Sequence, residues 1–388
     1  MLSWPQILRT ISILLLTVFL YDNSWARVAK MKEICSNCHT MHSSVGGAGD
    51  THDIASGVAD GVPGAVIAPQ EGLINKTCSG CHNGKNSTGS MPYVIDLLTS
   101  GPPKYGVTGT EGIATRDTLA GGSFYWVTIA DGGIKGHDVV GLNITQTNRT
   151  PPGGSKAFND TTTPLTCAGT NGCHGDNAAG MSQVESIWGG HHANITGSVT
   201  GGTSAATSYR FLNGIDGFED STWELTVDSS NHNQYKGITR TGDDDLVANE
   251  SSISHLCARC HGDFHNGDGT DAGVIGAAGS FGSPWVRHPV DVDMGPLAGA
   301  GTEYGSYGDG GAGIYNVRTP LASEDVSGRL SSVTLGGSGN NAIITCVTCH
   351  RAHGSEWDYS LRWKYYAWPD GSDTDAYNGC GDCHTAKN

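Results

Sequence analysis

The chain has 388 residues and a formal net charge of -16, with 15% charged residues, 7% aromatic residues and 58 glycines. This negative charge disfavours binding to nucleic acid and to anionic membranes. It suits cationic or mineral partners, or simply keeps the protein soluble. Segments with a helical period of 3.6 residues are few, so we expect a mostly irregular chain with short helices and a few short strands. Such a chain has few segments from which to build a hydrophobic core, so another component must fill its interior.

Residues 1–26 have the features of an export signal. Arg9 precedes the apolar run 11–20, and Ser24-Trp25-Ala26 resembles a small-residue cleavage site. The apolar run is too short to span a membrane comfortably, although an uncleaved anchor is the alternative. We therefore expect one exported domain over residues 27–388, with no membrane span after cleavage and a secreted, extracellular or cell-surface location.

The cysteines point to covalent haem. Ten of the twelve fall in five C-x-x-C-H units, and the other two form a widened C-x5-C-H unit. This pattern is typical of c-type haem, in which each cysteine forms a thioether and the histidine binds the iron. Zinc or disulfides could explain the C-x-x-C spacing alone, but the histidine repeated at the same place favours haem. For Cys167 and Cys173, a disulfide beside a free His174 is the alternative.

We therefore predict six haem c groups, each on its own unit, wrapped by the chain as one continuous stack. The predicted attachment residues are Cys35, Cys38, Cys78, Cys81, Cys167, Cys173, Cys257, Cys260, Cys346, Cys349, Cys380 and Cys383. The predicted proximal iron ligands are His39, His82, His174, His261, His350 and His384.

Ten further histidines can serve the opposite faces of the irons, whereas methionines number only six. Bis-histidine ligation gives low potentials and leaves no open coordination site, which favours electron transfer over catalysis and predicts no catalytic residues. The predicted distal ligands are His42, His137, His192, His265, His288 and His353. The alternatives left open are His52, His191, His232 and His255, and for His232 a hydrogen-bonding role is equally expected.

Three of these ligands lie close to a proximal histidine, and His265 follows His261 by four residues. His42 and His353 each follow one by three residues, so on a short helix the two rings share a face, and the second ring should ligate a different haem or none. Elsewhere in the chain, local composition predicts three short strands and one helix. The predicted short strands are 123–129, 209–212 and 223–227, and the predicted helix is 361–368.

The chain resembles the extracellular multihaem cytochromes of metal-reducing bacteria, whose members form conductive filaments. The matching stretches keep their order and span nearly all of residues 27–388: Cys35–His42, Gly136-His137, Tyr209–Leu212, Arg287–Pro289, Cys349–His353 and Cys383-His384. The resemblance implies bis-histidine haems and head-to-tail polymerisation. It also implies that His42 ligates the haem held by Cys346 and Cys349 of the neighbouring subunit.

The resemblance has a departure at the third haem unit. No histidine follows His174 by three residues, so we assign its missing ligand to the pair His191/His192. The expected function is extracellular electron transfer by a carrier that is not an enzyme, in a homopolymer that delivers respiratory electrons to metal oxides. The alternatives are a monomeric periplasmic or surface carrier and, third, a multihaem reductase of oxyanions.

Overall fold

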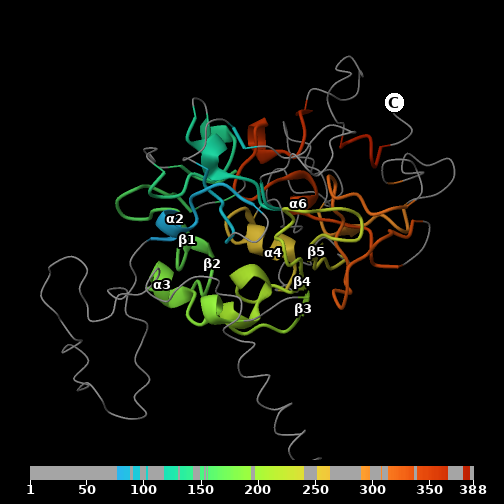
Figure 1. Ribbon diagram of the computed structural model, residues 1–388, viewed down its shortest axis with the longest axis horizontal. Coiled ribbons are helices and arrows are strands. Elements are labelled where there is room, and N and C mark those ends of the chain that lie inside the picture. Colours follow the sequence, from blue (N-terminus) through green and yellow to red (C-terminus); the bar gives the residue numbers. More distant parts are fainter. Residues whose placement is uncertain are drawn as a thin grey trace, which may run out of the picture.

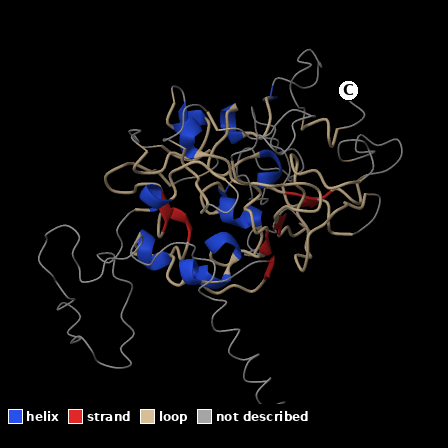
Figure 2. Cartoon of the chain, viewed as in Figure 1, coloured by secondary structure: helices blue, strands red, loops and turns tan. Residues whose placement is uncertain are grey.

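The structure is a computed structural model in which loops and turns predominate. The residues it describes are 77–87, 91–96, 102–103, 118–129, 132–142, 149–152, 154, 156–193, 197–239, 251–262, 290–297, 307, 313–335, 339–365 and 379–384. Short helices and small sheets are spread among these loops (Figures 1 and 2). The expectation of a mostly irregular chain with short helices and a few short strands is thus confirmed. None of the helices in these ranges is long and apolar enough to cross a membrane.

The helices are all short. The α-helices are α2 (Cys78–Cys81), α3 (Gln183–Ser186), α4 (Ile253–Ala258) and α6 (Cys346–Cys349). The 3-10 helices are η5 (Phe124–Val127), η6 (Gly132–Ile134), η7 (Gly190–His192), η8 (Ala205–Thr207), η9 (Tyr209–Phe211) and η10 (Asp358–Ser360). Helices α4 and α6, far apart in the sequence, pack side by side near the middle of the molecule (Figure 1).

Three small sheets complete the described fold. The parallel pair is β1 (Thr166–Ala168) with β2 (Gly172–His174). The antiparallel sheets are β3 (Gly197–Val199), β4 (Gly217–Glu219) and β5 (Gln234–Tyr235), in that order, and β6 (Val292–Asp293) with β7 (Ile343–Ile344).

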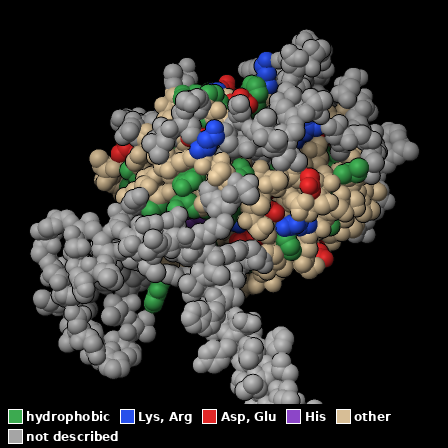
Figure 3. Space-filling model, in the orientation of Figure 1, with side chains coloured by type: hydrophobic (Ala, Val, Ile, Leu, Met, Phe, Trp, Pro, Cys, Tyr) green, Lys and Arg blue, Asp and Glu red, His purple; other side chains and the backbone are tan. Residues whose placement is uncertain are grey.

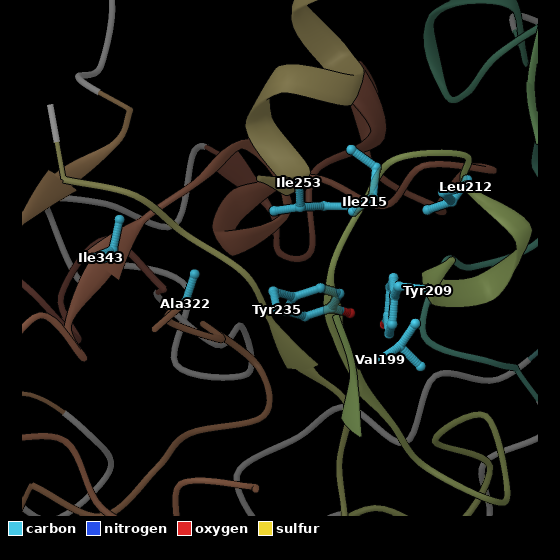
Figure 4. Close-up of a cluster of buried hydrophobic side chains, with 8 residues drawn as sticks. All are labelled: Val199, Tyr209, Leu212, Ile215, Tyr235, Ile253, Ala322 and Ile343. Atoms are coloured by element: carbon cyan, nitrogen blue, oxygen red, sulfur yellow. The ribbon is translucent and has the colours of Figure 1, made fainter. Parts of the chain in front are cut away.

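The buried apolar side chains form separate small clusters. The largest packs Tyr209 and Tyr235 with Ile253, Ile343 and neighbouring aliphatic residues (Figure 4). Strand β7 joins this cluster to a second one, because side chains alternate along a strand and Ile344 faces the other way. Each cluster touches a predicted attachment unit: Val347 packs on the first, Cys383 on the second, and Cys167 on a third. The apolar clusters therefore position the C-x-x-C-H units.

The local predictions for four stretches, three strands and one helix, were wrong where the structure describes them. Residues 124–127 form η5, not a strand, because the Ser123 side chain accepts a hydrogen bond from the Tyr125 N–H and starts a helical turn. Residues 209–212 turn sharply through left-handed backbone at Arg210 and Phe211, and residues 223–227 do the same at Trp223. Within 361–365, the described part of the predicted helix, Leu361 instead pairs with His350.

Replacing Ile343 tests how far the fold depends on strand β7. Ile343 is fully buried, so Ile343→Ala should lower the free energy of unfolding by about 2–5 kcal/mol, and Ile343→Val by about 0.5–1.5 kcal/mol. Ile314→Ala is the matched control, because Ile314 is 49% exposed. Denaturant unfolding followed by circular dichroism measures the three values. Equal losses for Ile343→Ala and Ile314→Ala would contradict the packing described here.

Candidate haem centres

The regular C-x-x-C-H units share one backbone turn. In the four that the structure describes, the N–H of the histidine donates to the carbonyl of the first cysteine at 2.8–3.0 Å. This bond closes a helical turn that brings both thiols and the histidine together. In α2 the turn is capped by Thr77, whose hydroxyl accepts from the Gly80 N–H, and in α6 Thr345 and Thr348 cap it. A Ser or Thr before such a turn satisfies its free N–H groups.

The widened third unit uses a different device. Cys167 lies on β1 and Cys173 on the adjacent, parallel β2, and the intervening residues loop out. Asn177 holds this loop by donating from Nδ2 to the carbonyls of Gly169 and Gly172, both at 2.8 Å. The extra residues therefore leave the second cysteine next to His174. Neither cysteine is in a disulfide, and the same is true of the other described cysteines.

Thiols of successive units meet. Cys78 of the second unit hydrogen-bonds the Cys167 thiol of the third, which lowers the pKa of Cys78 to about 7. In the same way, a hydrogen bond from Cys257 of the fourth unit lowers the pKa of Cys346 in the fifth. These contacts bring the second unit to the third, and the fourth to the fifth.

Two charge interactions of longer range extend this series. Desolvation raises the pKa of Cys349 to about 12, and it raises that of Cys173 as well, although Cys173 is an exposed residue. The thiols of Cys380 and Cys260, respectively, add to these shifts by charge repulsion. The third unit therefore lies near the fourth and the fifth near the sixth, so the units from the second to the sixth are neighbours in chain order.

Three pairs of histidine rings face each other across these units. The ring centroids of His82 and His191 are 6.2 Å apart. Those of His137 and His261 are 6.1 Å apart, and those of His174 and His353 are 6.3 Å apart. In each pair one ring belongs to a cysteine unit and the other comes from a distant part of the chain. The ring planes of the three pairs are 29°, 63° and 39° apart, respectively, and all three separations are longer than the 3.8 Å between His232 and Tyr315.

Backbone carbonyls orient most of these rings. Nδ1 lies 2.6–2.9 Å from a carbonyl oxygen in four of the six paired rings and in His350. The partners are Pro92 for His82, Ala352 for His137, Arg210 for His174, Pro152 for His261 and Tyr359 for His350. A carbonyl only accepts, so Nδ1 carries the proton and Nε2 keeps its lone pair. This is the tautomer in which a histidine binds a metal through Nε2.

Some of these rings are also held neutral. Burial lowers the pKa of His353 to about 3, and the nearby His174 and His137 add to the shift. Phe124 packs against the His353 ring at 4.8 Å between centroids. Partial burial lowers the pKa of His174 and His261 as well. A neutral imidazole is the form that ligates a metal, so these side chains are ready to bind one.

The geometry fits an iron between the rings of each pair. A metal ion lies about 2 Å from an imidazole nitrogen, so two rings that share one metal have centroids about 6 Å apart. The three observed separations match this value. Thiols and a Nδ1-bonded histidine on one side, and a second histidine on the other, are the groups that a c-type haem requires.

The structure places several predicted site residues and leaves others outside the described ranges. His137 and His353 lie opposite His261 and His174. The ring opposite His82 is that of His191, which the sequence left only as an alternative. His174 therefore faces His353 and not the pair His191/His192. The predicted site residues outside the described ranges are Cys35, Cys38, His39, His42, His265 and His288, to which the His192 side chain is added.

His232 has a different role. Its ring is fully buried and stacks on Tyr315, with centroids 3.8 Å apart and planes 7° apart. Nδ1 lies 2.7 Å from the Asn233 carbonyl and Nε2 lies 2.9 Å from the Leu330 carbonyl. Neither nitrogen is left for iron. Of the two roles that the sequence left open for His232, the structure shows the hydrogen-bonding one.

Comparison with known proteins gives a consistent result. Residues 340–388 match the family described as a doubled CXXCH motif. The chain is 25% identical to C-type cytochrome OmcS of Geobacter sulfurreducens, over 88% of this chain and 82% of that protein. The resemblance to filament cytochromes is confirmed.

Two solved structures of OmcS filaments from the same organism also match. The OmcS nanowires solved by cryo-electron microscopy are 22% identical, with a TM-score of 0.43 over 86% of this chain and 84% of that one. The Outer Membrane Cytochrome S filament is 20% identical, with a TM-score of 0.39 over the same shares.

Replacing His232 tests its assignment. His232→Phe keeps a ring for Tyr315 to stack on but removes the ring N–H, which leaves a carbonyl in the interior without its donor. We expect a loss of about 1–3 kcal/mol in the free energy of unfolding. The visible spectrum of the purified protein should stay unchanged, because no iron loses a ligand. A new high-spin band in His232→Phe would show that His232 binds iron after all.

Proposed function

We propose that this protein is an exported electron carrier that moves electrons along six covalently attached bis-histidine haems. The opposed rings of His82/His191, His137/His261 and His174/His353 carry this proposal, because each gap fits one iron with two axial ligands. Haem iron, when bound, supplies reversible one-electron chemistry. With both faces closed by histidine, no position remains for a substrate, so the protein is an electron carrier and not an enzyme.

The path for electrons follows from how the units meet. Thiols of the second and third units, and of the fourth and fifth, hydrogen-bond each other, and charge repulsion links the third unit to the fourth and the fifth to the sixth. This order supports haems that follow one another along the chain. The segment 350–353 ties three units together. His350 belongs to the fifth unit, the Ala352 carbonyl holds the His137 ring opposite the fourth, and His353 faces the third. In one domain over residues 27–388, these haems would form a continuous stack.

The ligand assignment follows the same geometry. We assign His191 to the second haem, His353 to the third and His137 to the fourth. His42, His265 and His288 stay the proposed ligands for the remaining haems, and His191 takes the place predicted for His192. For His350, the described residues show no opposing histidine ring like those of the three pairs. A ligand from another chain can therefore serve its haem.

We propose that copies join head to tail, with His42 ligating the fifth haem of the next subunit. The similar OmcS is described as forming nanowires, which supports a filament here. The net charge of -16 suits an extracellular carrier that hands electrons to cationic or mineral acceptors, such as metal oxides. On the face shown in Figure 3, the charged side chains of the described residues are scattered and do not form a patch of one sign.

Haem content and assembly test the proposal. A pyridine haemochrome assay of the purified protein should give six haems per chain, and its oxidised spectrum should be low-spin. Electron microscopy of material sheared from cells should show filaments, and His42→Ala should abolish them while leaving six attached haems. Normal filaments in His42→Ala would exclude the joint, and monomers alone would favour a monomeric carrier. A high-spin haem in intact filaments would favour a reductase.

The neighbours His191 and His192 provide a matched pair for the second haem. His191→Ala should convert one haem to high spin, because His82 loses its partner across the iron. His192→Ala should keep every haem low-spin. Electron paramagnetic resonance of the oxidised proteins measures both. The reverse result would return the assignment to His192.

A further inference from the structure

Two turns that contact a proximal histidine have the same backbone, which a third turn at Trp223 and Glu224 shares. Arg210 and Phe211 have φ angles of 50° and 62°, and Tyr359 and Ser360 have φ angles of 61° and 58°. In each turn the next residue is a leucine, whose N–H donates to the carbonyl of the residue before the left-handed pair, at 2.8 Å in Tyr209–Leu212 and 3.3 Å in Asp358–Leu361. We call these the 209 turn and the 358 turn.

Both turns hold a proximal histidine in the same way. In the 209 turn, the Arg210 carbonyl accepts from His174 Nδ1 at 2.9 Å and the Phe211 carbonyl accepts from the Gly175 N–H at 2.6 Å. In the 358 turn, the Tyr359 carbonyl accepts from His350 Nδ1 at 2.7 Å. The Ser360 carbonyl accepts from the Arg351 N–H at 2.8 Å. Each turn thus binds the histidine and the residue after it with two successive carbonyls.

The left-handed conformation explains this double contact. Successive residues of a strand point to opposite sides, whereas two successive left-handed residues turn both carbonyls to the same side. Side chains such as Arg, Phe and Tyr rarely adopt this conformation, which normally requires Gly or Asn. Strain of this kind persists where surrounding contacts enforce it. Glu219 does so in the 209 turn by accepting from the Arg210 N–H at 2.6 Å.

We propose that the two turns are positioning devices that lower the reduction potentials of the haems bound by His174 and His350. The inference rests on the proposed haem binding. A carbonyl held at Nδ1–H makes the imidazole a stronger donor to iron, which favours the ferric state and lowers the potential. The Nδ1 groups of His82 and His261 instead meet the carbonyls of Pro92 and Pro152, neither of which is left-handed. The second and fourth haems therefore serve as internal references.

Proline at Ser360 tests the 358 turn, because its ring fixes φ near -65° and excludes the left-handed region. In the purified holoprotein, Ser360→Pro should shift one haem of six to higher potential in a spectroelectrochemical titration, with all haems still low-spin. Ser360→Gly is the matched control. It accepts the left-handed conformation, so its titration should match that of the unchanged protein. Phe211→Pro should shift the third haem in the same direction relative to Phe211→Gly, because both variants lose the ring that packs against His191 at 5.5 Å between centroids and only the proline excludes the turn.

Several outcomes would overturn the inference. One is an unchanged titration in Ser360→Pro that is folded and low-spin, and another is an equal shift in Ser360→Gly. If Ser360→Pro does not fold, Ser360→Val is the second test. Its β-branched side chain disfavours the turn more mildly, so it should give a smaller shift in the same direction, and no shift would contradict the inference. A chain with no attached haem would refute the proposed function itself, which the haemochrome assay detects separately.

Discussion

The contact between the segment 350–354 and the loop 120–137 is the interaction on which the candidate haem centres depend most. The His353 N–H donates to the Gly121 carbonyl at 2.8 Å, and the Ser123 N–H donates to the Gly354 carbonyl at 3.1 Å. Gly122 has a φ of +83°, and a Cβ there would collide with the Gly354 carbonyl. These bonds hold His353 between Phe124 and His174, and they hold the Ala352 carbonyl against His137. Two histidine pairs are therefore set by one backbone crossing.

The rest of the described fold holds such crossings in place. The buried apolar residues form small clusters, each packed on a cysteine unit, and a large sheet or helix bundle is absent from the described ranges. Backbone carbonyls orient the histidines, and buried polar groups hold the loops that carry those carbonyls. Arg210 is an example. Its guanidinium donates a hydrogen bond to Asn233 Oδ1 at 2.6 Å, and its carbonyl accepts a hydrogen bond from His174 Nδ1. A chain organised in this way can be mostly irregular and still rigid where its ligands lie.

Local predictions failed where such demands outweighed propensity. The aromatic and aliphatic residues of 209–212 favour a strand. The observed left-handed turn presents two carbonyls to the third unit. Because that unit lies elsewhere in the sequence, the four residues alone do not predict the turn. Residues 358–361 present two carbonyls to the fifth unit in the same way. They share the backbone of 209–212 but not its side chains, so their sequence does not reveal the turn. His232 illustrates the opposite case, because its two carbonyl partners come from Asn233 and the distant Leu330, and only the folded chain shows that both nitrogens are occupied.

The sequence by itself determined the chemistry of attachment. Two cysteines and a histidine at fixed spacing form one local turn, so Cys346, Cys349 and His350 could be recognised without any knowledge of the fold. The mostly irregular fold class also followed from composition and the lack of long periodic segments. Only the tertiary structure decided which histidine lies opposite which. The rings of His82 and His191, like those of His174 and His353, meet because distant loops cross, and a sequence does not encode such a crossing at any one position.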